Sequence, residues 1–256
     1  MSQEPKEAKE RKTRSDKGLI MATSRDISCV AWIAEQYAAR ADQVRRLLSR
    51  FPDPERPFKG KLMAETTLKD QLSRWQRAGW IEYRRVLADM PGWCWPTKKG
   101  LALVGLDDLY SARAPASTRL DHIYAVNQLR LWMDGRYFWK SERRYRSEQM
   151  ELLKKGESLG PLPDALITDQ DDEVIAIEAE ISAKKPGEVL AKLVRLVRRY
   201  ENTGNGYEHA FPFIWFYVPN EHLKRLIESC IEDLPEPEQE RVSVAIEQDL
   251  IASRFR

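Results

Sequence analysis

Several residue patterns that would place the chain in a familiar class are scarce in its sequence. The 256 residues include three cysteines and three histidines, and neither set has the spacing of a zinc site or of a disulfide framework. Apolar runs stay well short of the roughly 18 residues that span a membrane, and the N-terminus lacks an apolar signal region. We therefore expect a cytoplasmic protein with reduced cysteines and no membrane partner.

Charged residues are abundant, but their distribution along the chain is uneven. Residues 1–22 hold 6 basic and 4 acidic residues, residues 23–115 hold 16 and 11, and residues 116–256 hold 20 and 25. We expect the first segment to be a disordered basic arm, because it has few large apolar residues. A polyanionic partner should meet the basic front half rather than the acidic remainder.

The first periodic part of the chain, residues 23–108, has the pattern of three helices followed by a hairpin. Helical spacing of apolar residues predicts helices over 25–40, 41–50 and 63–80. The third helix buries Leu68, Leu72 and Trp75, and Gly79 ends it as a left-handed cap. Two strands, 80–86 and 92–95, should follow, with a short helix from Lys98.

The stretch "LSRWQRAGWIEYRR…GWCWPTKKGLALVGL" resembles the winged helix-turn-helix family, with Trp75 where a leucine is usual. With its apolar stripe buried, the third helix would present polar side chains to a DNA major groove, and the hairpin would add two arginines at the backbone. These predicted contacts to double-stranded DNA are Thr66, Lys69, Ser73, Arg74, Arg77, Arg84 and Arg85. The alternative is a protein-binding winged helix whose polar helix face is merely solvated.

Residues 109–118 are predicted to be a linker, because small residues and a proline separate two periodic segments. A second domain, 119–256, should then have the order αβββαβαβ. Its strands are expected over 136–146, 160–170, 171–182, 211–219 and 241–248, with helices at 117–133, 186–204 and 220–234. The fold class is thus α/β (α+β) with two domains.

The stretch "VIAIEAEISAKKP" places two acids, Glu178 and Glu180, on one face of an apolar strand. Asp164 starts the preceding strand, so a hairpin would bring all three carboxylates together. Their repulsion has to be relieved by a proton or a cation, and Mg²⁺ or Mn²⁺ takes such oxygen ligands and could activate water against a phosphodiester. There are two alternative roles for the acids. They could protect an exposed edge strand against pairing with another sheet, or they could form ion pairs with Lys184 and Lys185.

The pattern P-D-x13-E-x-E at Pro163 to Glu180 resembles the PD-(D/E)xK nuclease superfamily. That resemblance implies a restriction-endonuclease-like αβββαβ domain in which Asp164, Glu178 and Glu180 bind metal. Glu180 stands where a lysine is usual, and Lys184 would supply the missing charge. Glu142 would be a further acid from the first strand. An inactive nuclease-like domain is equally compatible with the missing lysine.

A wider set of short motifs resembles the replication-relaxation family of bacterial plasmids and integrative elements. These motifs are His122, Val126, Asn127, Arg130, Trp139, Ser141, Glu142, Pro163, Asp164, Ala165, Glu178 and Glu180. The resemblance implies a DNA-binding protein that acts in plasmid replication, DNA relaxation or mobilisation, alongside other proteins of those processes. Because the usual lysine is missing, we expect its nuclease-like domain to be non-catalytic. The alternatives are a repressor that forms a homodimer through its second domain and a metal-dependent endonuclease.

Overall fold

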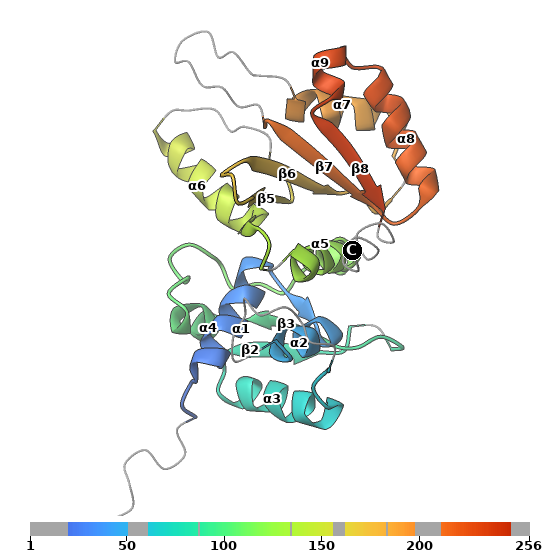
Figure 1. Ribbon diagram of the computed structural model, residues 1–256. Coiled ribbons are helices and arrows are strands. Elements are labelled where there is room, and N and C mark those ends of the chain that lie inside the picture. Colours follow the sequence, from blue (N-terminus) through green and yellow to red (C-terminus); the bar gives the residue numbers. More distant parts are fainter. Residues whose placement is uncertain are drawn as a thin grey trace, which may run out of the picture.

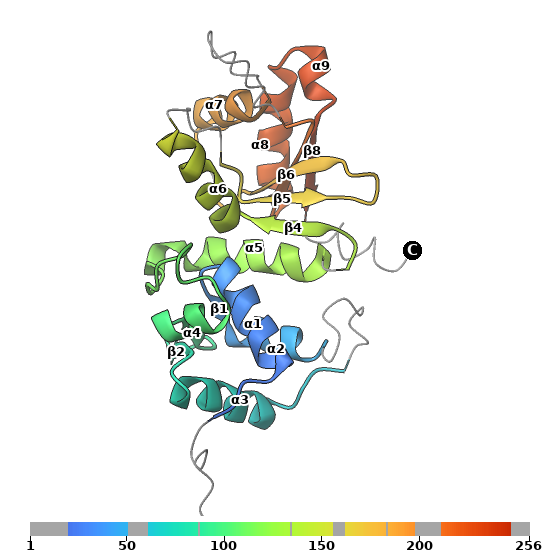
Figure 2. The same cartoon turned by 90° about the vertical axis from the view of Figure 1, so that its left-hand side faces the viewer.

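The computed structural model describes residues 20–50, 61–86, 88–133, 135–155, 162–182, 184–197 and 211–246. Within these ranges the chain is a mixed α/β protein with a three-stranded and a five-stranded sheet at opposite ends (Figure 1). Helix α5 lies between the two ends (Figure 2). None of the helices described has the length and apolar character required to cross a membrane. The predicted basic arm lies outside the described residues except for its last three positions.

The structure of the first end confirms the three helices and the hairpin that periodicity predicts there, but the first helix ends at Glu35 and not at residue 40. Its elements are α1 (Ser24–Glu35), β1 (Ala39–Arg40), α2 (Ala41–Leu48), α3 (Glu65–Arg77), β2 (Ile81–Arg84), β3 (Trp93–Pro96) and α4 (Lys98–Leu103). The sheet has the order β1-β3-β2, and both pairings are antiparallel. The two-residue strand β1 is too short to give a periodic signal, so sequence patterns miss it.

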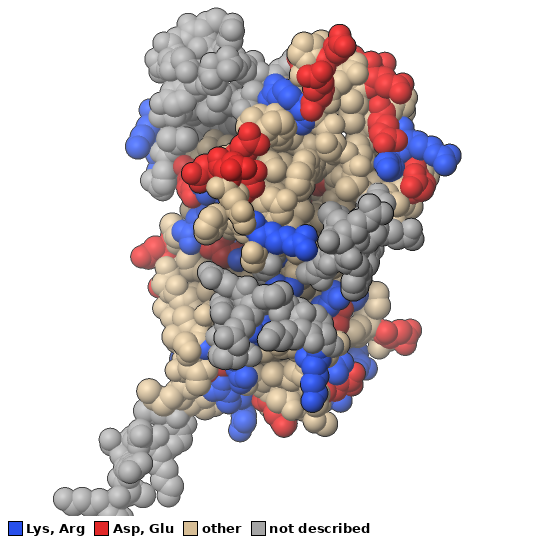
Figure 3. Space-filling view, viewed as in Figure 1, with Lys and Arg blue, Asp and Glu red and all other residues tan. Residues whose placement is uncertain are grey.

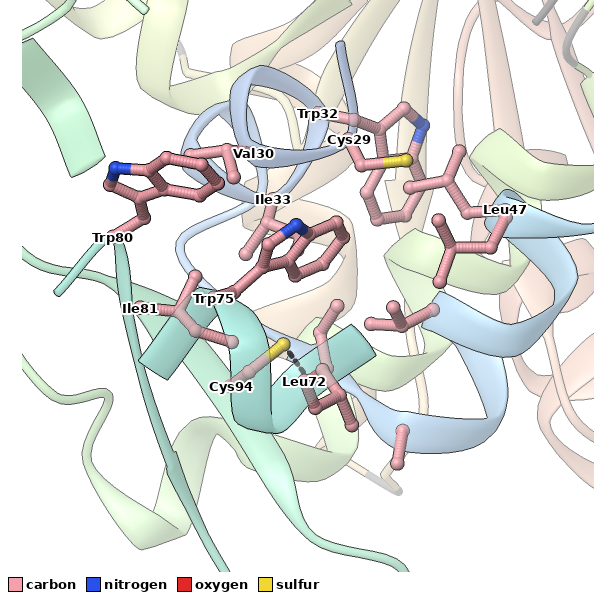
Figure 4. Close-up of a cluster of buried hydrophobic side chains, with 14 of the residues drawn as sticks. Cys29, Val30, Trp32, Ile33, Leu47, Leu72, Trp75, Trp80, Ile81 and Cys94 are labelled. Atoms are coloured by element: carbon pink, nitrogen blue, oxygen red, sulfur yellow. Dashed lines mark hydrogen bonds between the residues drawn. The ribbon is translucent and has the colours of Figure 1, made fainter. Parts of the chain in front are cut away.

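The core of this end is built around Trp75, which α3 buries completely against α1 and β2 (Figure 4). Gly79 ends α3 with a φ of 75°, which confirms the predicted left-handed cap. Gly100 lets α4 approach the strand region closely, because a Cβ there would lie 1.8 Å from the Trp80 carbonyl oxygen. Gly100 also takes part in the helix cap, because its N–H donates to the Thr97 hydroxyl at the start of α4.

The second end is the five-stranded sheet with order β4-β5-β6-β7-β8. Strands β4 to β6 pair antiparallel, and β6 to β8 pair parallel. Its elements, with the short 3₁₀ turn η1, are η1 (Ser117–Arg119), α5 (Leu120–Met133), β4 (Phe138–Ser141), α6 (Glu142–Lys154), β5 (Ala165–Thr168), β6 (Val174–Ala179), α7 (Pro186–Val197), β7 (Phe213–Val218), α8 (Glu221–Glu232), α9 (Glu236–Gln239) and β8 (Val242–Ile246).

The predicted order αβββαβαβ is wrong at one position, because helix α6 separates the first two strands. Strand β4 ends at Ser141, whose hydroxyl accepts from the Arg144 N–H at 3.1 Å and so caps the next helix. The aromatic residues before Ser141 favour a strand, so the strand predicted over 136–146 includes the first residues of α6. Glu142 is therefore the first residue of α6 and not an acid on a strand.

Strand β6 is central and covered on both faces, which corrects two sequence-based interpretations. Helix α5 packs on the face that carries Ile175 and Ile177, while α7 and α8 pack on the face that carries Ala176. The strand is therefore not half-buried. It is also third of five in its sheet, which excludes acids that protect an exposed edge.

Helix α5 joins the two ends because it is apolar on opposite sides. Leu131 belongs to the core of the first end, whereas Leu129 and Trp132 pack on the five-stranded sheet. The buried Asn127 donates to the Ala38 carbonyl oxygen at 2.9 Å, so polar bonds also cross this boundary. A helix without a polar face is expected where both sides are covered, and the two ends therefore share a continuous buried interface.

Candidate functional site

The three acids of the sequence pattern meet at the end of the β5–β6 hairpin. Asp164 precedes β5 directly, and its N–H donates to the Ile177 carbonyl oxygen at 3.0 Å, which places it beside Glu178. Its carboxylate also accepts from the Ala179 N–H at 2.8 Å. Glu180 follows β6, and its N–H donates to the Tyr217 carbonyl oxygen at 2.9 Å. The register of the two strands thus brings the acids together, as expected from a hairpin.

A lysine that sequence reasoning did not assign to the site lies between two of these acids. The Lys192 Nζ is 2.6 Å from a Glu178 carboxylate oxygen and 3.6 Å from a Glu180 carboxylate oxygen. Lys192 comes from α7, where it shares helical spacing with the buried Val189 and Leu196. A lysine on an apolar stripe is the signal that could have found it, because such a charge needs a buried partner.

The remaining charges of the cluster are also paired. The Lys184 Nζ is 2.6 Å from a Glu180 carboxylate oxygen, which agrees with the salt-bridged alternative from the sequence. The His122 Nε2, from α5, is 2.8 Å from an Asp164 carboxylate oxygen. Each acid therefore has a basic partner, and we name Asp164, Glu178, Glu180, Lys184, Lys192 and His122 the acid–lysine cluster.

Burial and mutual repulsion separate the pKa values of Asp164 and Glu178. Burial, followed by the charge of Asp164, raises the pKa of Glu178 to about 8, although Lys192 acts in the opposite direction. Burial also works against ionised Asp164, but the hydrogen bond from His122 and the charge of Lys192 hold its pKa below the usual value. The Lys192 pKa is raised by these acids in spite of burial. Near neutral pH the two carboxyl groups therefore share one proton, which Glu178 holds.

The protonated Glu178 predicts a pH dependence of stability. Because its pKa is raised on folding from 4.5 to about 8, the folded state binds the proton more tightly than the unfolded state. This contribution to stability is complete below pH 4.5 and is lost as the pH rises through about 8. Glu178→Gln should remove that decline, and urea unfolding of both proteins across this range measures it. An equal decline in the variant would mean that another group titrates.

A divalent metal ion does not fit the acids as they are placed. The donors are oxygens, the kind that Mg²⁺ takes, but His122 and the Ala179 N–H already occupy both oxygens of Asp164. The ammonium group of Lys192 stands where a cation would join Glu178 to Glu180. In the part of the chain that the structure describes, no three His, Cys, Asp or Glu side chains are grouped to hold a metal. A metal site here stays a prediction.

Glu142 lies near Asp164 but is engaged elsewhere. Its backbone N–H donates to the Asp164 carbonyl oxygen at 3.1 Å, and both residues line a small shared cavity. Its carboxylate, however, accepts from the Tyr37 hydroxyl at 2.5 Å and from the Arg146 guanidinium at 2.7 Å. Glu142 thus ties the first end of the molecule to α6 and makes no contact with Glu178 or Glu180.

On α3, the structure separates one arginine from the other predicted DNA contacts. The side chains of four residues are exposed, namely Thr66, Lys69, Ser73 and Arg77. Arg74 is instead partly buried, and its guanidinium is bound to the carboxylate of Asp26 in α1. Burial works against ionised Asp26, but Arg74, Thr23 and Trp75 donate to it and lower its pKa to about 2. Arg74 is therefore primarily part of the anchor between α1 and α3.

The hairpin adds two exposed arginines near α3. Arg84 pairs with Glu82 at 2.7 Å, and Arg85 follows it at the end of β2. Figure 3 shows Lys and Arg side chains protruding where α3 closes the lower end of the molecule, next to a few acids. Acidic side chains gather instead along α8 and α9 at the other end. The charge split of the sequence thus corresponds to two ends of the molecule.

In comparisons with known proteins, no family model, no curated protein and no solved structure matches this chain. The resemblance to the replication-relaxation family therefore stays a prediction from short motifs.

Proposed function

We propose that the chain is a DNA-binding protein of a mobile genetic element that binds duplex DNA through α3 and the β2–β3 hairpin. The supporting observation is the exposed polar face of α3, opposite the buried Leu68, Leu72 and Trp75. The order of three helices and a hairpin, with β1 completing the sheet, supports a winged helix-turn-helix. A role in plasmid replication, relaxation or mobilisation rests on the motif resemblance alone.

The placement of α3 suits a helix that enters a major groove. It lies at the end of the molecule opposite the five-stranded sheet, so its outer face is accessible (Figures 1 and 2). Lys69 and Arg77 are eight residues apart, about two helical turns, and both are exposed. Arginine and lysine can donate to guanine edges or to phosphates, while Arg84 and Arg85 would reach the backbone beside the groove.

For the second end we propose a nuclease-like domain that does not catalyse hydrolysis. The hairpin and parallel strands, with acids where the two meet, support a PD-(D/E)xK-like arrangement. Lys192, Lys184 and His122 pair with those acids, which supports a structural rather than a metal-binding role.

A metal-dependent endonuclease is the second candidate function. Lys192 favours this candidate. The nuclease resemblance requires a lysine beside the acids, Glu180 occupies the position where that lysine is usual, and Lys192 places an ammonium group there from α7. Metal would then have to displace the ammonium group from Glu178 or bind only together with DNA.

The double variant Lys69→Ala/Arg77→Ala should weaken binding of a labelled duplex and reduce its salt dependence. Each lost phosphate contact lowers the slope of log affinity against log salt by about 0.9, so the slope should fall by up to about 1.8. Fluorescence anisotropy over a range of salt concentrations measures both quantities. Arg225→Ala is the matched control, because Arg225 is an exposed arginine on α8 at the other end. Unchanged affinity and slope in a folded double variant would exclude α3 as the DNA-binding element.

A further inference from the structure

A second basic surface lies between the two ends of the molecule and is separate from α3. The segment 107–119 runs beside α6, on the left of Figure 1, and between them is a cleft of about 600 Å³. Five basic side chains and one acidic side chain line it, namely Arg113, Arg119, Arg143, Arg146, Lys154 and Asp108. Arg146 pairs with Glu142, but Arg113, Arg119 and Arg143 form no ion pair with a carboxylate among the described residues, and this positive charge favours an anionic ligand.

Arg143 forms the rigid floor of this cleft. Its side chain is 8% exposed, and its guanidinium donates to the carbonyl oxygens of Ala34 and Ser111, each at 2.7 Å. The guanidinium also lies 4.8 Å from the ring centroid of Tyr37 and 4.2 Å from that of Tyr110. Among the described residues it forms no ion pair with a carboxylate, although the charges of Glu35 and Glu142 nearby favour its charged form against burial. An anion bound in the cleft would give this guanidinium a direct ion-pair partner.

The mouth of the cleft is formed by Arg113 and Arg119, whose side chains are exposed. The Arg119 guanidinium lies 5.1 Å from the Tyr37 ring centroid. Tyr37 has a φ of 69°, a backbone conformation that costs free energy in any residue except glycine. The fold thus holds a strained tyrosine next to Arg119 and Arg143, and strained residues cluster at binding and active sites.

The cleft continues toward the acid–lysine cluster. Tyr37, Arg119 and Arg143 line both the cleft and the small cavity that Asp164 and His122 line. Positive charge therefore concentrates at the mouth, while the acids lie at the inner end.

We propose that this cleft binds the sugar–phosphate backbone of a single DNA strand. Guanidinium groups bind phosphate oxygens through paired hydrogen bonds, and a row of them follows a strand. A duplex, whose major groove alone is about 12 Å wide, is too large to be enclosed in a cleft of about 600 Å³. The assignment does not depend on α3, so a strand and a duplex would occupy different surfaces.

The test uses the full chain and a fluorescein-labelled oligothymidylate, with binding followed by anisotropy at several salt concentrations. Arg113→Ala/Arg119→Ala should weaken binding about tenfold and reduce the salt slope by up to about 1.4, since each contact to a single strand contributes about 0.7. Duplex binding by this variant should be unchanged. Arg113→Lys/Arg119→Lys keeps both charges and should retain most of the affinity, and circular dichroism confirms that the variants are folded.

The assignment would be overturned if the parent chain did not bind the oligonucleotide, or if the alanine variant bound it like the parent. It would also be overturned if Lys69→Ala/Arg77→Ala lost strand binding instead. Displacement of the strand by pyrophosphate at equal phosphate concentration would identify a small-anion site and would overturn it as well. Loss of duplex binding in the α3 variant alone concerns only the proposed function and leaves the cleft assignment standing.

Discussion

Lys192→Met should lower the free energy of unfolding by about 3–5 kcal/mol, because it removes the buried ammonium group that bridges Glu178 and Glu180 while keeping the length of the side chain. Among the described residues, Lys192 is the ammonium group that contacts both Glu178 and Glu180. The loss should be largest above the pKa of Glu178, about 8, where the carboxylate would be ionised without a partner. Urea unfolding followed by tryptophan fluorescence measures the change.

Two further variants make the Lys192 result specific. Lys184→Met removes a lysine that contacts the same Glu180 but is 38% exposed, and it should cost at most about 1 kcal/mol. Combining Lys192→Met with Glu178→Gln should recover part of the lost stability, because the unpaired acid is removed with its lysine. A Lys192→Met variant as stable as the parent would show that the lysine does not neutralise the acids.

Asp26→Ala should also lower the free energy of unfolding by about 3–5 kcal/mol. The carboxylate is fully buried and accepts from the Trp75 Nε1–H at 2.8 Å, from the Gln71 side chain at 2.8 Å and from the Arg74 guanidinium. All three donors belong to α3, so the variant would leave them unpaired in the core and loosen the proposed DNA-binding helix.

Arg74→Ala is the comparison for Asp26→Ala. It removes one hydrogen-bond donor, which is partly exposed, from the same ion pair and should lower the free energy of unfolding by less. Thermal unfolding of both variants gives the ranking. The stability that Asp26 supplies is present above its unfolded pKa of 3.8 and is lost as the pH falls through about 2, so the two variants should differ least in strong acid. A larger loss from Arg74→Ala would contradict the central role of Asp26.

Local patterns in the sequence predict the elements that depend on neighbouring residues. The apolar stripe of α3, the Gly79 cap and the convergence of Asp164 with Glu178 all follow from spacing and hairpin geometry. The sequence does not predict helix α6, because the aromatic run before Ser141 favours a strand. The only local signal for the change from strand to helix is the Ser141 cap, which is one residue. The position of α6 changes the setting of Glu142, which faces Tyr37 rather than the other acids.

Contacts between distant segments explain what sequence patterns did not predict. Arg74 looks like a free DNA contact until the fold places Asp26 beside it, 48 residues earlier in the chain. Lys192 follows the acids by more than ten residues and reaches them only because α7 returns across the sheet. The burial of β6 on both faces likewise depends on α5, whose position comes from packing rather than from the strand itself.

We propose that the chain binds DNA and does not cleave it, and one gel experiment tests both parts. Supercoiled plasmid is incubated with the full chain in Mg²⁺ and, separately, in a chelator, and is then run both directly and after removal of the protein. We expect the plasmid to be retarded by the protein in both conditions and to be supercoiled after the protein is removed. Absence of retardation would contradict DNA binding, and nicked or linear plasmid that forms only with Mg²⁺ would contradict a non-catalytic acid–lysine cluster.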